Sequence, residues 1–251
     1  LQNTMNKKVN FLNIPIDAIT MRETLNRVEQ VIASNQQIHH TVVNAGKVVL
    51  MQTDAVLEKS VVEADIINAD GQGVVWGANI LGKNIPERVS GIDLMESLVR
   101  IASKESYKCF FFGAREEVVK KVVDIYKHKY SEDIIAGYRN GYFEQEDEEE
   151  IANQIAESGA DMLFVAIRSP KKEVFLSTYK NKLKSVNLIM GVGGSFDVIS
   201  GKIARAPLWM QKIGMEWFFR FINEPIRTWR RYLLGNPKFV WLVFKAYLKN
   251  K

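Results

Sequence analysis

The 251-residue sequence has little cysteine and histidine, which narrows the chemistry open to it. Its one cysteine, Cys109, excludes an intrachain disulfide and lies in an apolar run, where a buried thiol is the better interpretation. The three histidines lack metal-ligand spacing, and no Asp-x-Asp pair is present to hold a divalent ion. The glycine patterns of dinucleotide-binding folds and P-loops are absent as well. We therefore expect no metal and no cofactor.

Long apolar stretches are also missing. No segment approaches the roughly 18 apolar residues that a membrane-spanning helix needs. The first residues, LQNTMNKKVNFLN, contain no apolar secretory signal. We expect a cytoplasmic protein, either soluble or peripheral on the inner face of the cell membrane.

Short apolar runs alternate with longer helical patterns, which is typical of a parallel sheet covered by helices. We expect strands at Val9–Ile14, Thr41–Asn44, Ile66–Asn68, Lys108–Phe112, Ile134–Gly137, Met162–Ile167 and Asn187–Gly191. Helical patterns cover Met21–Ser34, Ile92–Ser103, Glu116–Tyr130, Glu146–Glu157 and Lys171–Leu183, and Thr20 with Glu23 forms a capping-box pattern. The fold class predicted is α/β, with a mostly parallel, Rossmann-like sheet.

The composition changes near Arg205. Residues 205–251 carry a net charge of +8, which leaves −3 for the first 204 residues because the whole chain carries +5. Four of the five tryptophans lie in this tail, and Pro225 and Pro237 predict three short helices with breaks between them. We expect an α/β catalytic domain at 1–204 and a helical, basic and aromatic appendage at 205–251.

Three short motifs follow expected strands, where α/β proteins bind ligands. Gly191–Asp197 (GVGGSFD) permits close approach to a phosphate, or is an ordinary strand–helix turn. Asp70 in Asn68–Gly73 (NADGQG) is a candidate general base or a helix N-cap. Pro170–Glu173 (PKKE) reads alone as the solvated start of a helix.

The tail arginines are the fourth group. Arg227 and Arg230 are three residues apart, so both side chains can lie on one face of a helix. Together with Arg220 they form a group of candidate anion-binding residues. Such arginines bind a diphosphate or attract anionic lipid, with aromatic residues at the interface. A solvated position is the simpler interpretation for Arg231.

In their order along the chain, these blocks resemble the WecG/TagA/CpsF family of glycosyltransferases. The resemblance runs from Phe11–Ile16 to the tail and includes Asn44-Ala45, Asn68–Gly73, Pro86–Asp93, Asn140–Phe143, Pro170–Glu173, Gly191–Asp197, Arg205–Pro207, Glu216-Trp217, Arg220 and Glu224-Pro225. It implies metal-independent, inverting transfer of an N-acetylmannosamine-type sugar from a UDP-sugar to a polyprenyl-diphosphate-linked N-acetylglucosamine, in cell-surface polysaccharide (teichoic acid-like) synthesis.

The resemblance also implies roles for residues. Asp70 matches the general base, with Asn44 beside it, and Arg220, Arg227 and Arg230 match arginines that complete the site at an anionic membrane. The residues expected to bind substrate are Tyr142, Lys172, Glu173, Gly191, Gly193, Gly194 and Asp197. The chain has Val42 where relatives often have threonine and Lys172 where many have glutamine, which leaves the exact sugar open.

Two other functions remain open from the sequence. A membrane-recruited, nucleotide-binding regulatory module of the same fold would need no catalysis. The basic, aromatic tail also raises nucleic-acid binding, but no segment resembles a known RNA-binding motif, so we expect no nucleic-acid partner. A homo-oligomer is compatible with the sequence.

Overall fold

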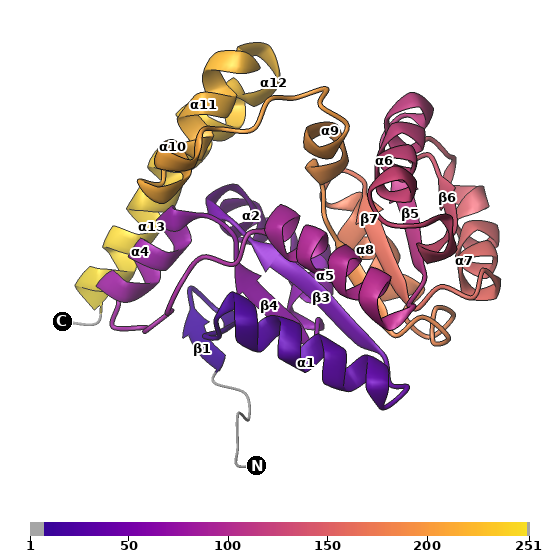
Figure 1. The fold of residues 1–251 in the computed structure, drawn as a ribbon. Helices are drawn as coiled ribbons and strands as arrows, with labels where there is room; N and C mark the ends of the chain where they lie inside the picture. The colour runs from indigo at the N-terminus through magenta and orange to yellow at the C-terminus, as the bar shows by residue number, and fades with distance from the viewer. Residues whose placement is uncertain (1–7, 250–251) are drawn as a thin grey trace.

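The computed structural model describes residues 8–249, apart from the side chain of Arg227. Its centre is a six-stranded sheet in the order β4-β3-β8-β7-β5-β6, and every neighbouring pair is parallel (Figure 1). The strands are β3 (Ile38–Val43), β4 (Ile66–Ala69), β5 (Cys109–Gly113), β6 (Ile135–Arg139), β7 (Met162–Ala166) and β8 (Leu188–Gly191). The predicted parallel α/β class is confirmed.

The strand expected at Val9–Ile14 is instead a hairpin. It consists of β1 (Lys8–Phe11) and β2 (Ile14–Asp17), which pair antiparallel in a separate two-stranded sheet. Leu12 and Asn13 form the turn with φ of 50° and 68°. Positive φ at both turn residues matches the twist of a two-residue hairpin. The hairpin was not predicted because the Leu-Asn pair lacks the glycine that usually marks such a turn.

Helices cover both faces of the sheet. The α1, α5 and α6 helices pack on one face, and α2, α3, α7 and α8 pack on the other (Figure 1). Their bounds are α1 (Met21–Ala33), α2 (Ala45–Met51), α3 (Ala55–Val62), α4 (Gln72–Ile80), α5 (Gly91–Glu105), α6 (Glu116–Lys129), α7 (Glu148–Glu157), α8 (Lys171–Thr178) and α9 (Ser195–Ile199), with short 3₁₀ turns η1 (Glu132–Ile134) and η2 (Gln145–Asp147). The capping box of Thr20 and Glu23 at the start of α1 is confirmed.

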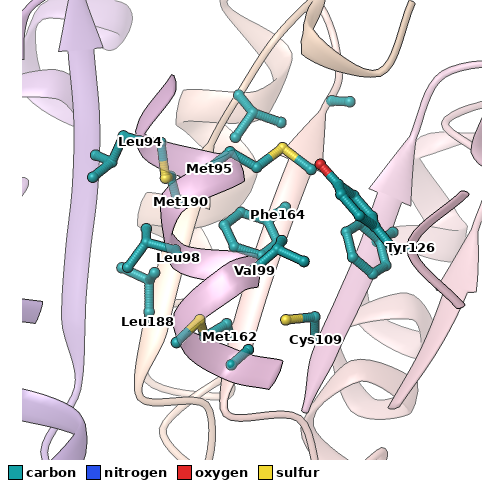
Figure 2. Packing of buried hydrophobic residues seen from close by; sticks show 14 of the residues in the cluster. Leu94, Met95, Leu98, Val99, Cys109, Tyr126, Met162, Phe164, Leu188 and Met190 are labelled. Carbon is teal, nitrogen blue, oxygen red and sulfur yellow. The ribbon is translucent and has the colours of Figure 1, made fainter. Parts of the chain in front are cut away.

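The largest core cluster fills the space between α5, α6 and the sheet (Figure 2). Leu94, Leu98 and Val99 on α5 face Met162, Phe164, Leu188 and Met190 on the strands. Cys109 lies fully buried in this cluster, and burial raises the pKa of its thiol. The interpretation of Cys109 as a buried, unreactive thiol agrees with this position.

The C-terminal residues form an arm of helices that returns to the core (Figure 1). They are α10 (Leu208–Lys212), α11 (Glu216–Asn223), α12 (Pro225–Trp229), a π-helical segment η3 (Arg230–Gly235) and α13 (Asn236–Lys249). Pro225 begins α12 as expected. Pro237 does not break the helix: Asn236 before it keeps helical φ and ψ of −64° and −44°, and the π segment precedes it.

The arm is anchored by α13, which packs on α2 and α4. Phe239 and Val243 of α13 are buried in the core cluster that contains Phe11. Both side chains lie close to Gly77 of α4. Within residues 8–249, no helix is both long and apolar enough to cross a bilayer.

Candidate active site

Each candidate side chain or loop follows the carboxyl end of a strand in the parallel sheet. Asn44 follows β3, Asp70 follows β4, Tyr142 follows β6, Lys172 and Glu173 follow β7, and Gly191–Asp197 follows β8. Because the six strands are parallel, these ends lie along one edge, where open α/β sheets bind their ligands.

Asp70 follows β4, and three residues of the arm, Glu216, Arg220 and Arg231, influence the pKa of its carboxylate. Its backbone N–H donates to the carbonyl of Val43 at 2.7 Å, which fixes it beside the end of β3. Among the described residues, no hydrogen-bond donor contacts its carboxylate. Burial raises the pKa of Asp70 and the charge of Glu216 raises it further, while Arg88, Arg220 and Arg231 act in the opposite direction. A half-buried carboxylate with a raised pKa suits a general base.

Asn44 is the N-cap of α2, where its Oδ1 accepts from the N–H of Lys47 at 3.1 Å. Gly71, the N-cap of α4, has φ of +126°, and a Cβ there would lie 3.8 Å from the Cβ of Asn44. The structure therefore brings Asn44 next to the Asp70 loop, as expected, and gives it a structural role in capping α2 as well.

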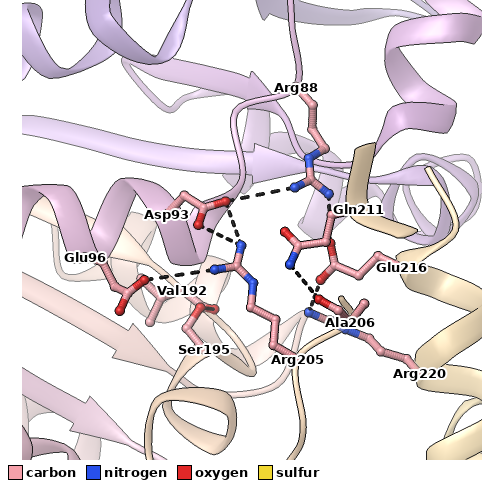
Figure 3. A network of polar contacts seen from close by, with 10 residues as sticks. All are labelled: Arg88, Asp93, Glu96, Val192, Ser195, Arg205, Ala206, Gln211, Glu216 and Arg220. Atoms are coloured by element: carbon pink, nitrogen blue, oxygen red, sulfur yellow. Dashed lines mark hydrogen bonds and ion pairs between the residues drawn. The ribbon is translucent and has the colours of Figure 1, made fainter. Parts of the chain in front are cut away.

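Glu216 of α11 connects two arginines, Arg88 and Arg220 (Figure 3). Its carboxylate accepts from Arg88 Nη1 and from Arg220 Nη2, each at 2.8 Å. Arg88 also lies 3.9 Å from Asp93 on α5, and Arg205 Nη2 donates to both carboxylate oxygens of Asp93 at 2.7 Å. This network joins the arm to the loop before α5 and holds the arginines in fixed positions.

The three tail arginines predicted for the site have different outcomes. Arg220 lies near Asp70: burial alone would lower its pKa, but Glu216 and Asp70 raise it. The guanidinium of Arg230 lies over the ring of Trp229, 5.3 Å from its centroid. The side chain of Arg227 lies outside the described residues.

A buried triad of charges lies under the site. The Glu173 Oε1 is 2.7 Å from Lys47 Nζ and also accepts from Lys172 Nζ, and all three side chains are almost inaccessible. Burial and the charge of Lys47 lower the pKa of Lys172 to about 8. Burial would raise the pKa of Glu173, but the two ammonium groups lower it to about 2. The Pro170–Glu173 motif is therefore only partly solvated: Lys171 is 42% exposed, but Lys172 and Glu173 are buried.

The glycine loop lies directly over this triad. A Cβ at Gly191 would lie 3.0 Å from Lys172 Cε, so the absent side chain leaves room for the buried lysine. Gly193 has φ of +55° and Gly194 caps α9 with its own backbone exposed. The loop thus packs against Lys172 on one side and offers open backbone on the other.

Tyr142 and Asp197 lie at the other end of the same edge. Tyr142 is 67% exposed, and its hydroxyl hydrogen bonds with Arg115, which raises the pKa of that guanidinium. The charge of Asp197 acts on Arg115 in the same direction, and Asp197 itself lies 3.6 Å from Lys202. Both predicted residues thus raise the pKa of Arg115, Tyr142 more strongly than Asp197.

Sequence reasoning missed four residues of the site: Lys47, Arg88, Glu216 and Arg231. Arg88 and Glu216 lie inside motifs that carry the family resemblance, and this position was the available signal. Lys47 had no such signal, and Arg231 was recognised as part of the basic tail but interpreted as solvated. Within residues 8–249, no group of three or more His, Cys, Asp and Glu side chains is arranged to hold a metal ion.

The fold is an open parallel α/β sheet with charged side chains gathered at the carboxyl ends of its strands, and comparison with known sequences gives the family. Residues 9–251 match the profile of the glycosyl transferase WecG/TagA/CpsF family, and the chain belongs to that family.

Two relatives illustrate the similarity. An N-acetylglucosaminyldiphosphoundecaprenol N-acetyl-beta-D-mannosaminyltransferase from Bacillus subtilis (strain 168) is 39% identical over 75% of this chain and 71% of its own length. A protein of the same name from Staphylococcus aureus (strain MW2) is 30% identical over 97% of this chain and 95% of its own length.

Proposed function

We propose that this chain transfers an N-acetylmannosamine-type sugar from a UDP-sugar to a polyprenyl-diphosphate-linked N-acetylglucosamine, with inversion and without a metal ion. The names of the relatives support the sugar and the acceptor. The observation that carries the proposal is the position of Asp70, a carboxylate with a raised pKa, beside Arg88, Arg220 and Arg231. The product would enter a teichoic acid-like polysaccharide of the cell surface.

In the proposed reaction, Asp70 removes the proton from the acceptor hydroxyl as that oxygen attacks the anomeric carbon. The bond from this carbon to the diphosphate oxygen breaks, and UDP leaves with the electron pair. Arg220 stabilises the negative charge that develops on the leaving group, with Arg227 and Arg230 as further candidates on the same arm. These cations take the place that a divalent ion has in other enzymes.

The opposite end of the edge is proposed to hold the nucleotide. Tyr142 offers an exposed ring and hydroxyl, and Asp197 lies in the first turn of α9. Gly193 has open space around it, and the exposed Gly194 follows it, so both leave backbone open for a phosphate. The glycine loop would be held in shape by the residues packed beneath it, Gly191, Lys172 and Glu173. The two charged side chains are buried, so they would support the loop rather than contact the nucleotide.

The arm from 205 to 251 is proposed to bring the site to an anionic membrane surface at the cytoplasmic face. Exposed aromatic residues on its helices include Trp209, Trp217, Trp229, Trp241 and Phe244. Tryptophan with lysine and arginine suits the headgroup region of a bilayer, where the acceptor lipid resides.

The proposal is tested with Asp70→Asn and a water-soluble acceptor analogue. We expect kcat to fall more than tenfold, beyond the about 1.4 kcal/mol that a tenfold loss represents, while UDP binding and the melting temperature remain. The matched control is Asp124→Asn, an exposed aspartate on α6. The wild type is also assayed with EDTA, where activity should persist.

The outcomes separate the alternatives. If the wild type binds UDP-sugar but transfers nothing to any lipid acceptor analogue, the protein is a nucleotide-binding module instead. If Asp70→Asn keeps a tenth of the wild-type kcat or more, Asp70 is not the base. Loss of activity with EDTA that magnesium restores contradicts the proposed role of the arginines.

A further inference from the structure

Arg231 of η3 lies over the start of α2, although the two segments are far apart in the sequence. A Cβ built on Gly46 would lie 3.1 Å from Arg231 Nε and 3.4 Å from its Cγ. The same built atom would lie 3.5 Å from the Oδ1 of Asn44. Arg231 therefore extends along the backbone of α2 toward the side chain that caps this helix.

The charge of Arg231 acts on two groups on either side of Asn44. It lowers the pKa of Asp70 after β4, and it also lowers the pKa of Lys172 on α8. β4 and β8 are the two neighbours of β3, and Lys172 lies under the first glycine of the loop that follows β8. The guanidinium thus lies near the middle of the edge, between the candidate base and the glycine loop.

Arg231 differs from the other arginines of the site in its partners. Arg88 and Arg220 share the carboxylate of Glu216, and Arg205 binds Asp93. Among the described residues, no carboxylate lies within ion-pair distance of Arg231. Its guanidinium lies over the neighbouring ring of Tyr232, 5.6 Å from the centroid. An exposed guanidinium without a carboxylate keeps its hydrogen-bond donors available for an anionic ligand.

We infer that Arg231 binds the diphosphate of the UDP-sugar and that Gly46 is the position that admits its side chain. This inference rests on the proposed function. A bidentate guanidinium between Asp70 and the glycine loop stabilises the negative charge that the leaving diphosphate gains when its bond to the anomeric carbon breaks. An alanine at position 46 would press against Nε and Cγ and move the guanidinium out of line.

The inference is tested by measuring the binding of UDP and of uridine to the full chain by calorimetry, together with transfer to a water-soluble acceptor. We expect Arg231→Ala to weaken UDP binding by at least about tenfold, the lower end for a lost charged hydrogen bond, and to leave uridine binding unchanged. Arg231→Lys should recover part of the loss. Lys238→Ala removes an exposed charge from the next helix and serves as the matched control.

Gly46→Ala provides a second, independent arm. Alanine favours a helix more than glycine does, so the variant should be as stable as the wild type or more stable, while its UDP affinity falls. In the Arg231→Ala background, Gly46→Ala should cause no further loss. Gly235→Ala is the control in the arm, because a Cβ there meets no atom within 4 Å.

Each result decides the question. Equal losses for UDP and uridine in Arg231→Ala, or normal transfer with normal UDP affinity, would overturn the inference. Additive losses in the double variant would mean that Gly46 acts without Arg231. A wild type that binds UDP through Arg231 but transfers no sugar would contradict the proposed function and leave Arg231 as an anion-binding residue.

Discussion

Glu173→Gln removes the carboxylate that two buried lysines share. In the wild type, Glu173 accepts from both Lys47 and Lys172, and the exposed fractions of the three side chains are 2%, 5% and 6%. Glutamine keeps the size of the side chain but not its charge. The variant therefore leaves two ammonium groups close together in the interior, with neutral acceptors such as the Val42 carbonyl and the Ser169 hydroxyl.

We expect the free energy of unfolding to fall by about 3–5 kcal/mol, the usual cost of leaving a buried charge without its partner. The loss should depend on pH. Without Glu173, the pKa of Lys172 falls below its present value of about 8, since burial and Lys47 already lower it and Arg231 adds to the effect. The unfolded chain then binds more protons than the folded one, so the stability of the variant rises with pH and its deficit narrows toward pH 8.

The measurement is urea unfolding at several pH values, compared with Glu149→Gln. Glu149 forms a 2.6 Å pair with Lys182 but is 69% exposed, so solvent screens the pair and its loss should cost far less than the loss of Glu173. Equal losses in the two variants, or a deficit of Glu173→Gln that does not change with pH, would refute the description of the triad as a charged, buried unit.

Two further predictions concern the arm. Glu216→Gln removes a charge that raises the pKa of Asp70, so the acid limb of the kcat/KM profile should move to lower pH; a limb that stays in place would contradict the coupling. Phe239→Ala should lower the free energy of unfolding by about 3–5 kcal/mol, because the ring is 5% exposed and lies 6.2 Å from the ring of Phe11. Phe244→Ala on the same helix, where the side chain is 49% exposed, should cost much less in the same urea assay.

The strands of the fold could be predicted from the sequence wherever a short apolar run ends at a turn. Six of the expected strands, from Thr41–Asn44 to Asn187–Gly191, correspond to β3–β8 within a few residues at their ends, because buried parallel strands are short and continuously apolar. The α2, α3 and α4 helices were missed. They are 7, 8 and 9 residues long, too short for a helical period to stand out.

The site could be predicted only as far as the strand ends. Asp70, Asn44 and the glycine loop follow parallel strands, and the parallel order alone brings them to one edge. The contacts between distant segments could not be predicted. The pairing of Arg88 with Glu216 joins residues 128 positions apart, and no local pattern encodes such a distance. The burial of Lys172 depends on its contact with Gly191, which ends the next strand along the chain.

The arm packs on the core and also places Arg231 at the candidate site, so it is less separate than a division at residue 205 implies. Arg231 and Phe239 are eight residues apart in a continuous helical segment, which is roughly 12 Å at the rise of an α-helix. Phe239 and Val243 pack against the helix that follows Asp70, and this packing sets where Arg231 meets Gly46. The domain boundary remains a proposal, but removal of the arm would expose Phe11 and the apolar side of α4 as well as remove the arginines. The buried face of α13 thus stabilises the core and at the same time holds Arg231 against Gly46.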